Sequence, residues 1–253
     1  MEKIIKEKLV EIEAQENVKI IGAFESGSRA WGFASPDSDY DVRFLYIRNR
    51  DDYLKLGGIR DVIEWQLDET LDINGWDIQK ALRLLYKSNP TIFEWCASPI
   101  VYLESNILFQ FKALLPEFFS CKKSLFHYWH MAETNYQKYL KTPEVRIKKY
   151  FYVLRPLLAA QWIIDKQCPP PMLFSELVEE ELDLTIKPEV DSLLQLKKEL
   201  PEMGLAPKVQ ILNDYIEERL VYIKDIADKM ENIKSSWNEL NRFFLDAIEG
   251  IYD

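Results

Sequence analysis

Two strand-like segments joined through a glycine-containing turn constrain the fold more than any other part of the sequence. Residues 18–24 are rich in β-branched side chains and run into Glu25-Ser-Gly-Ser, which is the pattern of a strand that ends in a turn. Residues 40–47 alternate well enough to predict a second strand. Because side chains alternate along a strand, Asp39 and Asp41 are expected to point to the same side.

The two aspartates carry the clearest chemical signal in the chain. Neighbouring carboxylates repel each other unless a cation lies between them, and Mg²⁺ prefers carboxylate and phosphate oxygens. Asp39 and Asp41 are therefore suited to a complex of a nucleotide with Mg²⁺, and Mn²⁺ is the alternative ion. Taken alone, an Asp-x-Asp that follows Asp37 and Ser38 also has the composition of a surface turn.

The turn before the aspartates has features of a phosphate-binding loop. Gly27 allows the backbone to approach a phosphate, and Ser28 Oγ with nearby N–H groups can bond its oxygens. Arg29 can add a charge-assisted contact. A Gly-Ser turn by itself is common and indicates only a turn.

Together the two motifs resemble the DNA polymerase β nucleotidyltransferase superfamily, in which a Gly-Ser, a short helix and a turn precede an Asp-x-Asp on the next strand. Ser28 and Asp39 lie 11 residues apart, and every motif position is matched. Further segments resemble the bacterial RNA-repair-pathway polymerase-β family of predicted nucleotidyltransferases, and the similarity covers roughly residues 15–180. These segments are residues 72–82, 87–95, 98–102 and 149–162.

The resemblance implies transfer of a nucleoside monophosphate from a nucleoside triphosphate, such as ATP, to a hydroxyl acceptor, with release of pyrophosphate. It implies two Mg²⁺ ions held by Asp39, Asp41 and a third carboxylate. Asp72, flanked by aliphatic residues, is the favoured third member, and it would orient or deprotonate the acceptor hydroxyl. Asp77 and Glu64 are the alternatives, although Asp77 is interpreted mainly as a helix cap.

Cationic side chains of the helical half are candidates for the phosphates. Lys149 and Arg155 belong to a basic cluster that also contains Arg146 and Lys148, with Tyr150 and Tyr152 between them. The nucleotide-binding residues are therefore predicted to be Gly27, Ser28, Arg29, Lys149 and Arg155. The competing interpretation of the cluster is a solvated face that pairs with surrounding glutamates. For the only histidines, His127 and His130, packing is favoured over metal binding.

The pattern along the chain predicts an α+β protein. A polymerase β-like catalytic domain, with a small mixed sheet and flanking helices, is expected over residues 1–104, and an all-α domain that closes the nucleotide cleft over residues 105–253. Strands are predicted at 18–24, 40–47, 59–67 and 70–73. Helices are predicted at 2–15, 77–87, from Asn89-Pro90 onward, and at about 106–119, 122–140, 145–166, 188–199 and 208–246.

Composition narrows the partners. The formal charge of −10 disfavours tight, sequence-blind binding to long nucleic acid, while a bound cation could still bring a nucleotide. Three separated cysteines and no long apolar run predict a cytoplasmic protein without membrane contact. The family resemblance, rather than composition, points to an RNA end as the first candidate acceptor. A small molecule, a protein side chain, or a non-catalytic nucleotide-binding or antitoxin-like role are the alternatives, and the oligomeric state is left open.

Overall fold

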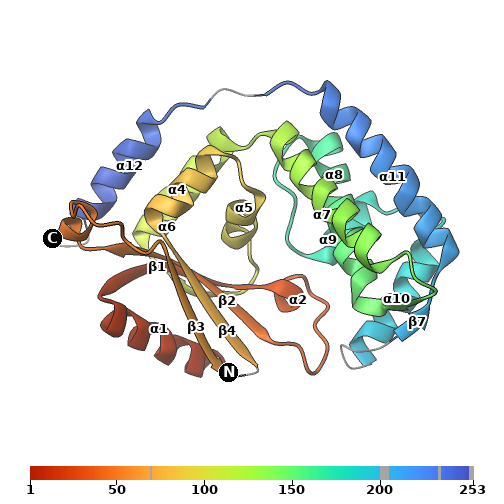
Figure 1. Cartoon of the computed structure of the whole chain (residues 1–253), viewed down its shortest axis with the longest axis horizontal. Helices are drawn as coiled ribbons and strands as arrows, with labels where there is room; N and C mark the ends of the chain where they lie inside the picture. Colours follow the sequence, from red (N-terminus) through yellow and green to blue (C-terminus); the bar gives the residue numbers. More distant parts are fainter. Residues whose placement is uncertain (69, 200–204, 233–234, 251–253) are drawn as a thin grey trace. The chain divides into compact units, whose positions relative to one another are not determined.

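The computed structural model describes residues 1–68, 70–199, 205–232 and 235–250, and it confirms the α+β class (Figure 1). The chain divides into two compact units that interleave along the sequence. The first unit contains Met1–Gly27, Asp39–Phe118 and Lys234–Asp253, and the second contains Ser28–Ser38 and Phe119–Ile233. The expected division at residue 104 into a catalytic domain and a domain that closes the nucleotide cleft stays a prediction, because the compact units do not reveal which part has which function.

The first unit is built on a five-stranded mixed sheet. Its strands are β1 (Val18–Ser26), β2 (Tyr40–Arg48), β3 (Val62–Asp68), β4 (Leu71–Asp77) and β5 (Val101–Glu104). They lie in the order β3-β4-β2-β1-β5, with β2 and β4 parallel and the other neighbours antiparallel. The parallel pair matters for the site, because it brings two segments 31 residues apart into register.

Helices cover both faces of this sheet. They are α1 (Glu2–Glu16), α3 (Arg50–Tyr53), α4 (Ile78–Tyr86), α5 (Pro90–Cys96), α6 (Asn106–Phe118) and α12 (Asn238–Glu249). Helix α1 packs Ile5, Leu9 and Ile12 against buried side chains of one face. Helices α4, α5 and α6 lie over the other face (Figure 1). The short helix α2 (Gly27–Ala30) begins directly after β1.

The second unit is mainly helical. Its helices are α7 (Cys121–Tyr139), α8 (Ile147–Lys166), α9 (Phe174–Glu181), α10 (Lys187–Glu199) and α11 (Gln210–Lys229), and a two-stranded ribbon pairs β6 (Glu144–Arg146) with β7 (Leu205–Pro207). Helix α8 is buried over most of its length and packs against α7, α9 and α11. It is therefore the central helix of this unit.

Several predicted boundaries were wrong. The strand expected at 70–73 continues to Asp77. Ile73 and Gly75 are buried while Asn74 and Trp76 are only partly buried, and this alternation continues the strand pattern. The helix expected over 208–246 is two helices, α11 and α12. Asn238 N–H donates to Ser236 Oγ at 3.2 Å just before α12, which gives the second helix a polar start of its own.

Several short elements were not predicted. The helix expected from residue 145 begins at Ile147, because Val145 and Arg146 pair with β7. Strand β5 has only four residues, and α9 has only three buried side chains, so neither has enough periodicity for recognition. Within the described ranges, no helix combines the length and the apolar character needed to cross a bilayer.

The pairing of β2 with β4 generates a stability prediction at Gly75. Phe44 lies opposite Gly75, and a Cβ at this glycine would overlap the Phe44 ring. Because Phe44 is fully buried, Gly75→Ala is expected to lower the free energy of unfolding by about 1–3 kcal/mol through overpacking. Gly58→Ala, which meets no atom within 4 Å, is the control in urea unfolding. Equal stability of the two variants would contradict this packing.

Candidate active site

Asp41 and Asp72 are neighbours across the parallel β2–β4 pair. Their Cα atoms are partners in the strand register, so their side chains leave the sheet on the same face. Both are partly exposed, with 31% and 50% of the side-chain surface accessible. Two carboxylates therefore stand side by side at a solvent-accessible part of the sheet, where a cation can reach them.

Arg43 lies between these carboxylates and was not singled out from the sequence. Its Nη2 donates to Asp41 Oδ1 at 2.9 Å and to Asp72 Oδ2 at 2.8 Å. Its Nη1 donates to the backbone oxygens of Val42 and Asp72 at 3.1 and 3.3 Å. The signal that could have revealed it is its position, two residues after Asp41 and so on the same side of the strand.

Gly27 is the residue that makes room for Asp41. Its φ is 61°, a left-handed conformation that glycine adopts readily, and a Cβ at this position would overlap Asp41 Oδ2. The glycine is therefore required twice, by its backbone conformation and by the close approach of the carboxylate. This places the predicted turn directly against one of the predicted metal ligands.

Glu25 supports the same region from the protein interior and was also missed. Its side chain is fully buried, and Oε1 accepts the backbone N–H of Asp41 at 2.9 Å. The hydroxyl of Tyr102 donates to Oε2, and Ser98 Oγ donates to the Glu25 carbonyl at 2.7 Å. A buried carboxylate with these partners fixes the start of β2 relative to β1 and β5.

Asp39 is the exposed residue that precedes β2, two positions before Asp41. Its neighbour Ser38 ends the segment of the second unit that begins at Ser28. Within that segment Arg29 Nη2 donates to the Ser38 carbonyl at 2.6 Å, and the Ser28 carbonyl accepts the Phe33 N–H at 3.1 Å. Arg29 therefore holds the loop that leads to Asp39.

A buried lysine of α10 holds the same loop. Lys197, which is 3% exposed, donates from Nζ to Ser35 Oγ at 2.8 Å, and Ser35 Oγ lies 2.9 Å from Ser38 Oγ. Both serines are buried as well. A polar network inside the second unit therefore fixes the loop before Asp39. Lys197 lies 162 residues after Ser35, so sequence spacing could not have identified it as a partner.

The alternative third carboxylates have other environments. Asp77 lies on the opposite face of β4 from Asp72, where it accepts the Gln79 N–H at 2.8 Å as the N-cap of α4 and the Tyr53 hydroxyl at 3.0 Å. Burial raises the pKa of Asp77 to about 6. Glu64 is exposed and pairs in register with Asn74 rather than with Asp72. Of the three candidates, Asp72 alone lies beside Asp41 in the register.

The two cations of the predicted helical half that are expected to bind nucleotide, Lys149 and Arg155, have protein partners within the second unit. Lys149 Nζ lies 4.0 and 4.5 Å from the ring centres of Tyr139 and Tyr152, and burial lowers the pKa of this lysine. Arg155 is 2% exposed, with its guanidinium 4.8 Å from the Trp31 ring. Arg155 therefore packs in the core of this unit, and contact with a phosphate would require it to leave the Trp31 ring.

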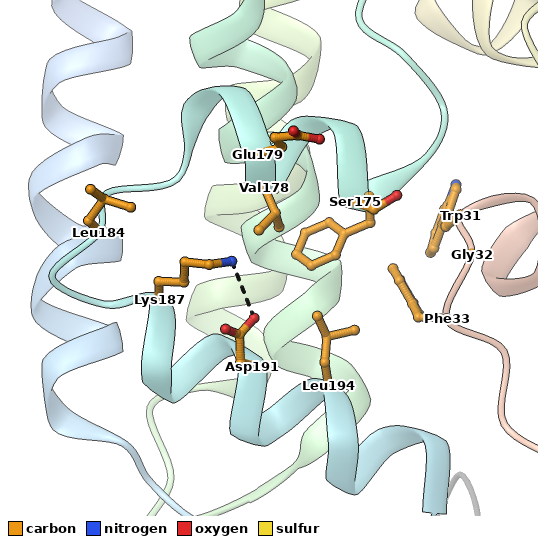
Figure 2. A pocket seen from close by; sticks show the side chains of 11 residues that line it. Trp31, Gly32, Phe33, Ser175, Val178, Glu179, Leu184, Lys187, Asp191 and Leu194 are labelled. Atoms are coloured by element: carbon orange, nitrogen blue, oxygen red, sulfur yellow. Dashed lines mark ion pairs between the residues drawn. The ribbon is translucent and has the colours of Figure 1, made fainter.

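A cavity of about 430 Å³ lies in the second unit. In Figure 2, Trp31 and Phe33 stand on one side of it, while Lys187 and Asp191 of α10 form an ion pair of 3.6 Å on the other. The size falls within the range of small-molecule sites, and the walls are mostly apolar. All of its lining residues belong to the second unit.

The possible metal ligands in the described part of the chain are dispersed rather than gathered in larger groups. There, no group of three or more His, Cys, Asp or Glu side chains is gathered as a preformed metal site. The histidines pack against aromatic rings instead: His130 lies 4.8 Å from Trp129, and His127 lies 5.7 Å from Tyr128. Mg²⁺ often uses only one or two carboxylates and takes its other ligands from water and phosphate, so an aspartate pair fits it.

A mixed sheet with paired aspartates beside a Gly-Ser turn is the arrangement expected of polymerase β-like nucleotidyltransferases. The chain belongs to the RNA repair pathway DNA polymerase beta family, whose model matches residues 1–246. The family points to a nucleotidyltransferase in general, and nucleotidyltransferases of this fold generally use divalent metals.

Two individual proteins were also matched. The uncharacterized protein YcgL of Bacillus subtilis (strain 168) is 42% identical over 255 residues, which covers 100% of this chain and 98% of that protein. The crystal structure of a nucleotidyltransferase-like protein from Exiguobacterium sibiricum 255-15 is 15% identical and covers 88% of this chain and 74% of that one, with a TM-score of 0.32. Family membership rests on the sequence matches, since a TM-score of this size is low.

The buried carboxyl of Asp77 generates a prediction about pH. Its pKa is raised in the folded protein, so folding favours the protonated form, and this group's contribution to stability is lost as pH rises from about 4 through about 6. Asp77→Asn keeps an oxygen for the Gln79 N–H and removes the charge. Relative to wild type, it is expected to gain about 1–3 kcal/mol of unfolding free energy between pH 4 and pH 7. Parallel stability profiles for the two proteins would contradict this assignment.

Proposed function

We propose that the protein is a Mg²⁺-dependent nucleotidyltransferase that moves a nucleoside monophosphate from a nucleoside triphosphate to a hydroxyl, with an RNA end as acceptor and pyrophosphate as the second product. The observation that carries the proposal is the Asp41–Asp72 pair on adjacent parallel strands, with Gly27 packed against Asp41. The family gives the reaction class, and its description supports an RNA acceptor.

The donor set fits the ion that such a reaction needs. Asp39, Asp41 and Asp72 would hold two Mg²⁺ ions, and Mn²⁺ has similar ligand preferences. When bound, the ions supply positive charge for the attacking and departing oxygens. An acidic protein benefits particularly, because its formal charge of −10 otherwise disfavours an approaching triphosphate.

The protein's own residues would position the acceptor and bind the triphosphate. Asp72, the more exposed of the cross-strand pair, would orient the acceptor hydroxyl and accept its proton. Gly27 and Ser28 would receive the triphosphate with backbone and hydroxyl donors, and Arg29 would add charge. Lys149 and Arg155 are proposed as further phosphate contacts because they belong to the basic cluster of the helical half.

The first test removes the carboxylates one at a time. Asp39→Asn, Asp41→Asn and Asp72→Asn are each expected to lower nucleotidyl transfer at least 100-fold, because each loses a charged metal ligand, while the far-ultraviolet circular dichroism is unchanged. Asp77→Asn is the matched control, since it lies on the same strand as Asp72 but on its other face. Full activity in Asp41→Asn, or loss of activity in a folded Asp77→Asn, would refute the assignment.

The second test identifies the acceptor. The protein is incubated with Mg²⁺, each α-labelled nucleoside triphosphate in turn, and RNA with either a free or a 3′-deoxy end. Label is expected on the free 3′ end only, and EDTA should abolish the transfer.

Other outcomes of this assay separate the alternatives. Label on an aminoglycoside-type alcohol or on protein would replace RNA as the acceptor while keeping the chemistry. Nucleotide binding with no transfer to any of these acceptors, and no release of pyrophosphate, would favour a non-catalytic nucleotide-binding or antitoxin-like protein.

A further inference from the structure

Arg43 lies between the two carboxylates and supplies a positive charge to both of them. One nitrogen, Nη2, is within 2.9 Å of Asp41 Oδ1 and within 2.8 Å of Asp72 Oδ2. The other oxygen of Asp41 faces Gly27. One oxygen of Asp41 and one oxygen of Asp72 therefore accept hydrogen bonds from the same guanidinium.

The guanidinium is held by hydrogen bonds to two carboxylates that remain partly exposed rather than by burial in an apolar site. Its side chain keeps 18% of its surface exposed, and the longer of its two backbone contacts is 3.3 Å. Ion pairs between partly exposed groups are worth about 1 kcal/mol or less. A divalent ion with carboxylate and phosphate ligands can therefore compete with it for the same oxygens.

We propose that Arg43 is a built-in counterion of the metal site, which neutralises Asp41 and Asp72 in the metal-free protein and must be displaced before a divalent ion can bridge them. This inference rests on the proposed function. The Arg43 counterion weakens binding of the free metal ion, because the ion has to break two ion pairs. A triphosphate that arrives with the ion gives the released guanidinium a new anionic partner, so metal and nucleotide bind more tightly together than separately.

A purely structural role for Arg43 predicts the opposite sign for its removal. If the guanidinium only braced the carboxylates in a shape suited to metal, its loss would weaken metal binding. If it competes with metal, its loss leaves two like charges side by side and strengthens metal binding. The direction of the change in affinity therefore distinguishes the two roles without any measurement of activity.

The test measures Mn²⁺ binding to the full-length protein by isothermal titration calorimetry in the absence of nucleotide. Arg43→Gln is expected to bind the ion about tenfold more tightly than wild type at low salt. Arg43→Lys should fall between them, because an ammonium cannot replace the planar guanidinium fork. Arg83→Gln is the matched control, since Arg83 is exposed on α4 and its guanidinium donates to Gln79 on the same helix. Unchanged or weaker binding in a folded Arg43→Gln variant would overturn the inference.

Thermal unfolding gives a second readout from the same proteins. In EDTA, Arg43→Gln should melt below wild type, because the carboxylates lose their counterion. Saturating Mg²⁺ should raise its melting temperature more than that of wild type, in line with its tighter binding. Equal metal-induced shifts in the two proteins would contradict displacement.

A third measurement separates this inference from the proposed function. In wild type, a non-hydrolysable triphosphate analogue should tighten Mn²⁺ binding, and the gain should be smaller in Arg43→Gln. Tighter binding by Arg43→Gln, combined with no transfer to any acceptor, would support the counterion and refute the enzyme. Transfer by wild type, combined with unchanged Mn²⁺ affinity in Arg43→Gln, would support the enzyme and refute the counterion.

Discussion

The electrostatic repulsion between Asp41 and Asp72 is the constraint on which the first unit's site depends. Parallel pairing of β2 with β4 puts the two carboxylates next to each other, and such a pair needs a positive charge nearby. Arg43 supplies that charge from the same strand, two residues along. Gly27 makes space for Asp41, and the buried Glu25 fixes its backbone. Three residues from two strands and a turn therefore stabilise one unfavourable pair of charges.

Strand β4 shows how backbone direction assigns different roles to similar residues. Asp72 and Asp77 lie five positions apart, so they emerge on opposite faces of the sheet. Asp72 stays half exposed beside Asp41, while Asp77 is buried, caps α4 and bonds Tyr53, with its pKa raised by burial. The aspartate at position 72 is therefore accessible to a metal ion, while the aspartate at position 77 is part of the protein interior.

Three cations of this acidic chain have partners inside the folded units. Arg43 pairs with the aspartates, Lys197 holds the loop that leads to Asp39, and Arg155 packs on Trp31 in the second unit. This distribution agrees with the charge-based argument against sequence-blind binding to long nucleic acid. It is compatible with recognition of a nucleotide that brings its own divalent ion.

Local sequence alone determined strand β1, the Gly-Ser turn after it, the start of β2 and the caps of α4 and α5. Each of these features depends on contacts within a few residues. It also identified the family through motif spacing, which the family match confirmed. The tertiary structure decided which carboxylate lies beside Asp41, because strand pairing joins positions 31 residues apart. It alone revealed the partners of Arg43, Glu25 and Lys197, since their hydrogen bonds form only when distant segments pack together and exclude water.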